Sequence, residues 1–225
     1  MCGIFFCLDI NINITKCIEC LNLLKNRGPD YNHYDIINNM FFGQTVLSIV
    51  GNYNKNNFNS KNNLILYNGE IYNYKDIDFN NNSDTNVLIN LFEKNVNFNK
   101  IINLLDGMYC FICFNKKKNK LFISRDLQGE KGLYYYKDDE KIIFSSEIKP
   151  ILYYLNIQKL NIQNLQNYFF TRHLITVNET IYENINIVEA GQNITINLDD
   201  NLWTYNCRDI GDYVSKEKLN YYNKL

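Results

Sequence analysis

The second residue of the chain is a cysteine, within the opening stretch "MCGIFFCLD". Methionine aminopeptidases remove an initiator methionine when the next side chain is small, and Cys2 would then carry both a thiol and a free α-amine. Such an amine has a pKa of about 7.7 to 8.0, and its unprotonated fraction at neutral pH can accept the thiol proton. Cys2 is therefore a candidate nucleophile that contains its own base. The alternative is an ordinary buried cysteine at the start of a first strand.

Histidine, the usual partner of a nucleophile, is scarce in this chain. The two histidines, His33 and His173, stand in unremarkable segments, and we expect them at the surface or in loops. The sequence also contains no G-x-G-x-x-G or Walker-type loop that would bind nucleotide phosphates. These observations favour an N-terminal nucleophile over a cysteine–histidine or serine–histidine pair.

Acyl transfer to a thiol also needs hydrogen-bond donors for the developing oxyanion and groups that hold the substrate. An apolar run ends at Asn68-Gly69 in "LILYNGEIYNY", where an amide can donate and a glycine allows close approach of the backbone. Asp84 opens a helical pattern in "NNSDTN" and can cap the helix or bind an ammonium group. Taken alone, each segment is more typical of a structural feature, a hairpin turn or a helix start, than of a binding site. Their occurrence behind Cys2 indicates an acyl-transfer site.

Seven cysteines without an export signal are expected to be thiols rather than a disulfide framework. Two pairs have the C-x-x-C spacing of zinc ligands, Cys17 with Cys20 and Cys110 with Cys113. The second pair lies in the strand-like run "MYCFICF", in which residues three apart point to opposite faces. The sequence therefore predicts no metal site.

Short strand-like runs dominate the chain, and several are apolar on both faces. Helical patterns occur at about residues 15–26, 84–95, 147–155 and 161–170. Many strands with few long helices predict two packed sheets flanked by helices, an α+β fold. We expect one domain over residues 1–200, followed by a polar tail or linker over residues 201–225.

The composition excludes several classes of partner. The formal net charge of the 225 residues is -1, and no extended basic cluster is present, so neither nucleic acid nor an acidic membrane surface is expected as a partner. No signal peptide and no apolar run long enough to span a bilayer is visible. We expect a soluble cytoplasmic protein.

The segments "MCGI", "RGPD", "YNGEIYNY", "SDT", "LDGMYCF", "SRDLQGEKGLYYY" and "SSEIK" follow one another along the chain. This ordered set closely resembles the glutaminase domain of the asparagine synthetase family, the N-terminal-nucleophile (class II) glutamine amidotransferases. The resemblance covers Cys2 to about Leu198. It implies a four-layer αββα sandwich that hydrolyses glutamine to glutamate and ammonia through a γ-glutamyl thioester, supplying ammonia for asparagine synthesis.

The resemblance also implies roles for individual residues. Cys2 would be the nucleophile, Asn68 and Gly69 would form the oxyanion hole, and Asp84 would hold the α-amino group of the substrate. Arg27 looks like a family residue that orders the loop beside the nucleophile. The implied substrate-binding set further comprises Glu70, Ile49 and Val50. The glutaminase reaction would need no cofactor.

The sequence departs from the family pattern in a segment that normally reads "RLSIVD". Here it reads "VLSIVG", with Val46 in place of an arginine that grips the substrate α-carboxylate and Gly51 in place of the aspartate. Losing such a charge-assisted contact typically costs about 1.5 to 3 kcal/mol. Val46 therefore predicts glutamine binding weaker by about one to two orders of magnitude.

The resemblance extends to a partner. Asparagine synthetases continue into an ATP-pyrophosphatase-type synthetase domain, which we expect here as a further domain or a separate subunit. ATP and Mg²⁺ would be required only with that partner. The alternative is a catalytically impaired domain that is retained for protein interaction or regulation. An acceptor such as a sugar phosphate or a purine precursor is disfavoured, because "NGEIYNY" and "SDT" resemble the asparagine branch most closely.

Overall fold

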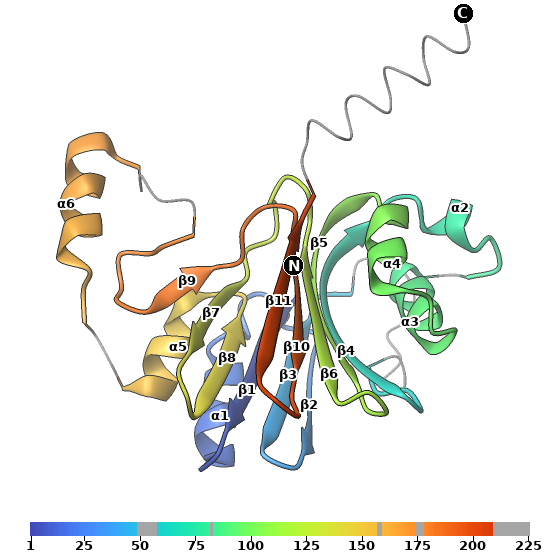
Figure 1. The fold of residues 1–225 in the computed structure, drawn as a ribbon, viewed down its shortest axis with the longest axis horizontal. Helices are drawn as coiled ribbons and strands as arrows, with labels where there is room; N and C mark the ends of the chain where they lie inside the picture. Colours follow the sequence, from blue (N-terminus) through green and yellow to red (C-terminus); the bar gives the residue numbers. More distant parts are fainter. Residues whose placement is uncertain (49–57, 82, 157–158, 174–177, 209–225) are drawn as a thin grey trace, which may run out of the picture.

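Two antiparallel sheets form the centre of the molecule (Figure 1). The computed structural model describes residues 1–48, 58–81, 83–156, 159–173 and 178–208. The first sheet has the strand order β2 (Tyr31–Ile37), β3 (Met40–Val46), β1 (Gly3–Asp9), β8 (Lys141–Ser145), β7 (Tyr134–Lys137) and β9 (Ile185–Ile187). The second has the order β11 (Leu202–Cys207), β10 (Gln192–Asn197), β6 (Lys120–Arg125), β5 (Gly107–Asn115) and β4 (Asn63–Ile71).

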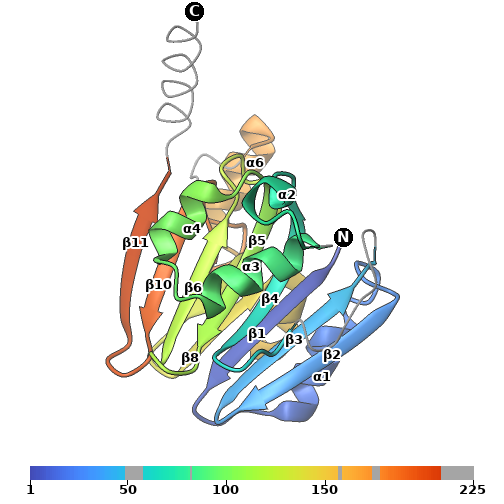
Figure 2. The same cartoon turned by 90° about the vertical axis from the view of Figure 1, so that its right-hand side faces the viewer.

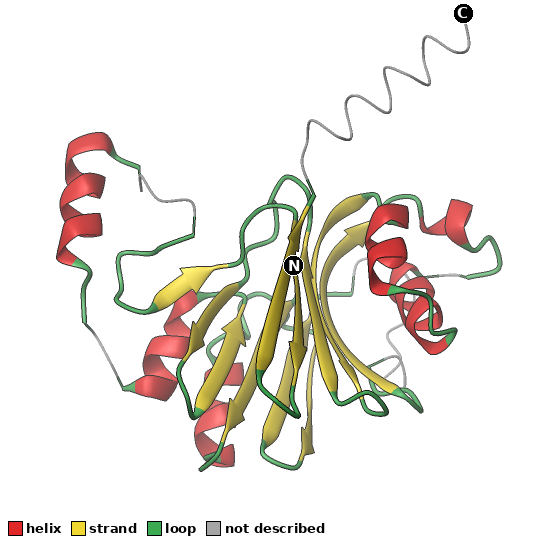
Figure 3. Cartoon of the chain, viewed as in Figure 1, coloured by secondary structure: helices red, strands yellow, loops and turns green. Residues whose placement is uncertain are grey.

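Helices cover the outer faces of both sheets (Figures 2 and 3). The first sheet is covered by α1 (Ile14–Asn22) and α5 (Ile148–Leu155), and the second by α3 (Asp84–Glu93) and α4 (Phe98–Leu104). The short α2 (Tyr74–Ile77) follows β4, and α6 (Ile162–Thr171) projects on the β9 side of the first sheet (Figure 1). The four-layer αββα sandwich implied by the motifs is confirmed. In the part of the chain that the structure describes, no helix is both long and apolar enough to cross a membrane.

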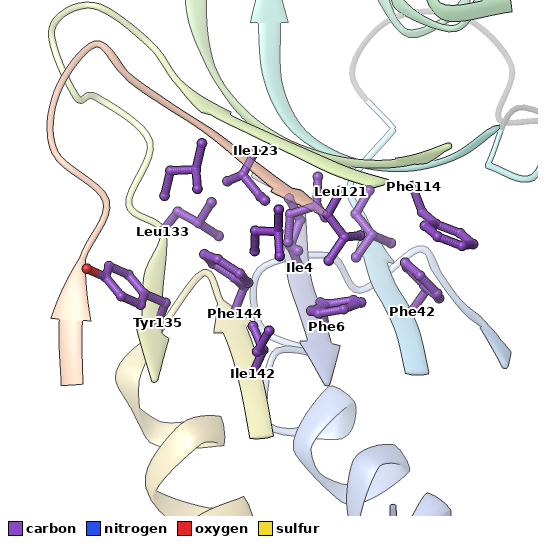
Figure 4. Packing of buried hydrophobic residues seen from close by; sticks show 14 of the residues in the cluster. Ile4, Phe6, Phe42, Phe114, Leu121, Ile123, Leu133, Tyr135, Ile142 and Phe144 are labelled. Carbon is purple, nitrogen blue, oxygen red and sulfur yellow. The ribbon is translucent and has the colours of Figure 1, made fainter. Parts of the chain in front are cut away.

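Alternation along the strands sorts the apolar residues into three layers. In β1, Phe6 points between the sheets, whereas Phe5 packs under the helices. The inter-sheet layer is rich in aromatic and branched side chains, among them Phe42 and Phe144 (Figure 4). Strands that are apolar on both faces are therefore explained by burial on both sides, as the sequence predicted.

The strand-like run around Cys110 and Cys113 behaves as predicted. Cys110 belongs to the inter-sheet core, and Cys113 packs on the opposite face, beneath α3 and α4. Since their side chains lie on opposite faces of β5, these two thiols cannot bind one metal ion together.

Three sequence expectations need correction. His33 is buried in β2, edge-on against the ring of Phe58 with centroids 4.1 Å apart, rather than at the surface. The helix α4 was not predicted, because the segment is short and polar between its apolar residues. The ordered sheet also runs past the predicted boundary at residue 200, since Trp203 of β11 stacks on Phe144 with a centroid distance of 6.0 Å. Residues 209–225 of the predicted tail lie outside the described residues.

Glu93, the last residue of α3, ties that helix to the start of β4. Its carboxylate accepts hydrogen bonds from the side-chain amides of Asn62 and Asn63, both at 2.7 Å, and from the Asn62 backbone N–H at 3.1 Å. Partial burial opposes ionisation, but the hydrogen bonds from Ser60, Asn63 and Asn62 outweigh it and lower the pKa of Glu93 from 4.5 to about 2. The ionised carboxylate therefore stabilises the folded state.

We expect Glu93→Gln to lower the free energy of unfolding by about 1 to 2 kcal/mol at neutral pH. Because folding lowers the pKa of Glu93, the Glu93 carboxylate contributes fully to the free energy of unfolding above pH 4.5. This contribution is lost as the pH falls toward about 2. The difference between variant and wild type should therefore shrink below about pH 4.5. Urea unfolding at a series of pH values measures it, and a difference that stays constant with pH would contradict this role.

Candidate active site

Cys2 and Val46 lie side by side on the first sheet. Gly3 of β1 pairs with Thr45 of β3, so the next pair along the two strands is Cys2 with Val46. Directly opposed residues of an antiparallel pair share a face, and Ile4, two residues beyond Cys2, belongs to the inter-sheet core. Cys2 and Val46 therefore face the space between the sheets, at one end of the inter-sheet layer.

Asn68 and Glu70 reach the same layer from the second sheet. In β4, Leu64 and Leu66 belong to the inter-sheet core, and Asn68 and Glu70 continue this alternation. The two sheets are joined at this point, because the Gln44 side chain hydrogen-bonds to the backbone of the residue before Asn68. The structure thus brings the predicted nucleophile and the predicted oxyanion residues to one end of the inter-sheet layer.

The Cys2 residue is held through its backbone. Arg27 Nε donates to the carbonyl oxygen of Cys2 at 3.0 Å, and the same guanidinium pairs with Glu147 at 3.1 Å. The thiol contacts the Leu47 carbonyl at 3.9 Å. Burial raises the pKa of the Cys2 thiol from 9.0, against the opposing effects of the Leu47 contact and the Arg27 charge. At neutral pH the thiol is therefore protonated and needs a base to become a nucleophile.

The "RGPD" segment packs against the C-terminal end of β3. A Cβ atom on Gly28 would lie 2.3 Å from the Val46 nitrogen, so only glycine permits this approach of the two backbones. Asp30 donates its N–H to the Val46 carbonyl at 3.1 Å, and its carboxylate accepts from Ser48 N–H at 2.8 Å. This turn therefore fixes the end of β3, which is followed in the chain by three residues discussed in the sequence analysis. Those residues, Ile49, Val50 and Gly51, lie outside the described residues.

Asn68 is buried, and its amide is not saturated. Its Nδ2 is 3.9 Å from the Cys110 sulfur, and its Oδ1 has no hydrogen-bond partner among the residues that the structure describes. Burial raises the pKa of Cys110 to about 12, so that this sulfur stays a neutral thiol and a weak acceptor. A buried amide left in this condition is available to a ligand.

The outer edge of β4 presents backbone groups toward the site, because no further strand of the described residues pairs with it beyond an isolated bridge between Asn59 and Leu64. Its outward N–H groups alternate along the strand. Ile65 donates to the Phe58 carbonyl, Tyr67 to Gln44, and Ile71 to Asp84. By the same alternation Gly69 N–H also points outward, and the structure gives it no acceptor within the described residues.

Asp84 is anchored at the first turn of α3 by three donors. Its Oδ2 accepts from the Tyr67 hydroxyl at 2.6 Å and from Ile71 N–H at 3.1 Å, and its Oδ1 accepts from Thr85 N–H at 2.7 Å. Burial, together with the Asp84 charge, raises the pKa of Tyr67 well above its usual range, so the hydroxyl remains a donor. The Asp84 charge also acts on the Cys2 thiol and raises its pKa, which places this carboxylate within electrostatic reach of the nucleophile.

Comparison with known proteins gives the family. Residues 1–205 match the glutamine amidotransferase domain family. The chain belongs to this family. The domain is 39% identical over 144 residues to a putative glutamine-hydrolyzing asparagine synthetase 2 of Methanocaldococcus jannaschii, covering 60% of this chain and 28% of that protein. It is 33% identical over 173 residues to a probable asparagine synthetase of Acanthamoeba polyphaga mimivirus, covering 67% and 30% of the two chains.

A solved structure resembles this glutamine amidotransferase domain in fold. The glutamine phosphoribosylpyrophosphate amidotransferase of B. subtilis superimposes with a TM-score of 0.61 at 13% identity, over 91% of this chain and 49% of that one. The chain spans only about 30% of the length of the asparagine synthetases that it matches. The family resemblance predicted from the motifs is confirmed.

Two residues of the site were not predicted, Gln44 and Tyr67. Both lie in mostly apolar strands, Gln44 after Phe42-Gly43 and Tyr67 after Leu66, where the pattern suggests further core positions. For Gln44 a signal was present, since a polar residue on the inter-sheet face of a strand must find a hydrogen-bond partner.

Proposed function

We propose that the chain hydrolyses glutamine to glutamate and ammonia through a thioester on Cys2. The observation that carries this proposal is the meeting of Cys2 with Asn68 and Gly69 at one end of the inter-sheet layer in a glutamine amidotransferase domain. The family match and the relatives favour this enzyme over the alternative of a domain kept only for protein contacts or regulation.

The reaction begins once Met1 has been removed. The Cys2 α-amine accepts the thiol proton, and the sulfur attacks the side-chain amide carbon of glutamine, so that an S–C bond forms and the carbonyl oxygen becomes negative. The ammonium form of the α-amine then protonates the leaving nitrogen, the C–N bond breaks, and ammonia departs. Water, activated by the same amine, hydrolyses the thioester and restores the thiol.

Asn68 Nδ2 and Gly69 N–H are the donors that would receive the oxyanion. Asn68 Nδ2 donates only to the weakly accepting Cys110 sulfur, at 3.9 Å, and Gly69 N–H points outward from the edge of β4. Donors held rigidly by a strand stabilise the transition state because they need no reorganisation when charge develops. Asp84 would bind the ammonium group of the substrate, and Glu70, Ile49 and Val50 would line its binding site.

The ammonia would pass to an ATP-pyrophosphatase-type synthetase domain or subunit for asparagine synthesis. The aligned segment spans only 28% and 30% of the two relatives that support this, so each relative is more than three times as long as that segment. ATP and Mg²⁺ would belong to that partner and not to the glutaminase site. We place the protein in the cytoplasm.

The proposal is tested with protein whose N-terminus at Cys2 has been verified by intact mass. Such protein should release labelled ammonia and glutamate from amide-labelled glutamine in equal amounts. If correctly processed protein releases neither, the proposed function is wrong.

Val46→Arg should strengthen glutamine binding, because Val46 lies beside Cys2 where a guanidinium could pair with the substrate α-carboxylate. We expect the KM for glutamine to fall by about 10- to 100-fold. Val46→Leu, which adds bulk without charge, serves as the control. A KM that is unchanged in Val46→Arg, with the fold intact, would show that this position does not contact the substrate.

A further inference from the structure

We propose that Gln44 is a positioning residue for the oxyanion hole, and that its side chain pairs with the edge of β4 where the described part of the chain supplies no neighbouring strand. This inference rests on the proposed function, because it assigns Gln44 a task in glutamine hydrolysis. Gln44 would not contact the substrate. It would act through the backbone of Tyr67, which immediately precedes Asn68 and Gly69.

The contact has the form of a β-ladder. Gln44 Nε2 donates to the Tyr67 carbonyl at 2.8 Å, and Tyr67 N–H donates to Gln44 Oε1 at 3.0 Å. The two bonds are specific for the orientation of the amide, because a flipped amide would oppose N–H to N–H and oxygen to oxygen. The Gln44 side chain therefore pairs with Tyr67 as a residue of a neighbouring strand would.

The contact between Gln44 and Tyr67 lies two residues from Gly69 on the same edge of β4, and this position relates it to the oxyanion hole. On the same edge, the outward N–H of Ile65 is bound by Phe58 and that of Ile71 by Asp84. The Gly69 N–H between Tyr67 and Ile71 is left for the substrate. Gln44 and Asp84 thus hold the edge on either side of Gly69, and fix the direction in which its N–H points.

The contact also joins the two halves of the site. Gln44 belongs to β3 and lies opposite Ile4, two residues from Cys2, whereas Asn68 and Gly69 belong to the other sheet. The distance from the nucleophile to the oxyanion donors therefore depends on how the sheets are held together here. Gln44 is buried, at 8% exposure, so its two hydrogen bonds do not compete with solvent.

Removing the amide should affect the transition state more than substrate binding, because the oxyanion contact forms only as the sulfur attacks. For Gln44→Met, of similar length and without donor or acceptor, we expect kcat to fall by about 10- to 100-fold with KM changed less than about threefold. The rate of Cys2 alkylation by iodoacetamide should stay within about twofold of wild type, since alkylation forms no oxyanion.

Gln44→Glu provides a rescue. Its ionised carboxylate accepts from Tyr67 N–H but repels the Tyr67 carbonyl, whereas the protonated acid can donate to that carbonyl as the amide does. Burial raises the pKa of such a carboxyl. The ratio of kcat in Gln44→Glu to kcat in wild type should therefore rise as the pH is lowered from about 8 to about 5.5.

Asn63→Leu is the matched control. Asn63 is fully buried at the opposite end of β4, and its amide bonds Glu93 and Asn115 at 2.7 and 2.8 Å. Losing these bonds should lower the free energy of unfolding, as Gln44→Met also does. The kcat of Asn63→Leu should nevertheless stay within about twofold of wild type when both variants are assayed well below their melting temperatures.

The outcomes separate the two proposals. A fall in kcat confined to the Gln44 variants, with recovery of Gln44→Glu at lower pH, supports the positioning role. Equal losses in Gln44→Met and Asn63→Leu, or a kcat of Gln44→Met equal to that of wild type, would overturn it while the glutaminase proposal stands. Wild-type protein that starts at Cys2 and does not hydrolyse glutamine would overturn the proposed function, and the role of Gln44 with it.

Discussion

Cys2→Ala should abolish glutamine hydrolysis, with kcat lowered by at least about 1000-fold. Alanine removes the sulfur on which the thioester is proposed to form, while the α-amine and the oxyanion donors remain. The side chain is small and lies at the rim of the core, so the free energy of unfolding should change by less than about 1 kcal/mol. Glutamate release measures the first quantity and urea unfolding the second.

The control is Cys207→Ala, which removes an exposed thiol at the end of β11, on the other edge of the second sheet. Its activity should match wild type. Residual Cys2-independent hydrolysis in the Cys2→Ala protein would place the nucleophile elsewhere.

Gly69→Ala should both destabilise the domain and disable the site. Gly69 has φ of 151°, and a Cβ atom there would lie 2.1 Å from the Met108 carbonyl oxygen and 2.5 Å from the Tyr109 Cα. Because both obstacles are backbone atoms of β5, the strands must move apart. We expect the free energy of unfolding to fall by about 3 kcal/mol or more, and kcat of the remaining folded protein to fall by about 100-fold as Gly69 N–H is displaced.

Gly107→Ala is a matched comparison, since a Cβ atom at Gly107 would lie 2.1 Å from the Glu70 carbonyl across the same strand pair. Gly107→Ala should lower the free energy of unfolding by a similar amount, as measured by thermal unfolding. Gly107, however, is not a proposed oxyanion donor. If both variants lose kcat to the same extent at equal folded fraction, Gly69 has no particular role as a donor.

Much of the fold could be predicted from local patterns. Strands such as β5 are apolar on both faces because the inter-sheet core and the helices bury them from opposite sides, and this pattern is visible in "MYCFICF". Two other features were not visible in this way. The helix α4 is short, and its three polar or charged residues interrupt the pattern of its apolar face. The strand β11 lies at a sheet edge with mostly exposed residues, so its sequence resembles a linker.

The site could be predicted as far as it depends on the types of its residues and their order along the sequence. Cys2, Asn68, Gly69 and Asp84 were selected because a nucleophile, an amide, a glycine and a carboxylate each offer distinct chemistry. Gln44 was not selected, because its role depends on a pairing between two sheets that no spacing in the sequence reveals. Once the register of β1 and β3 is known, Gln44 falls opposite Ile4, two residues from the nucleophile.

The central claim is that Cys2 forms a γ-glutamyl thioester, and trapping that species tests it most directly. Protein that begins at Cys2 should be mixed with glutamine, quenched in acid during turnover, digested, and analysed by mass spectrometry. We predict that the N-terminal peptide carries one γ-glutamyl group, that hydroxylamine removes it, and that Cys2→Ala shows no adduct. Sustained ammonia release without an adduct on Cys2, or with the adduct on another residue, would contradict this account.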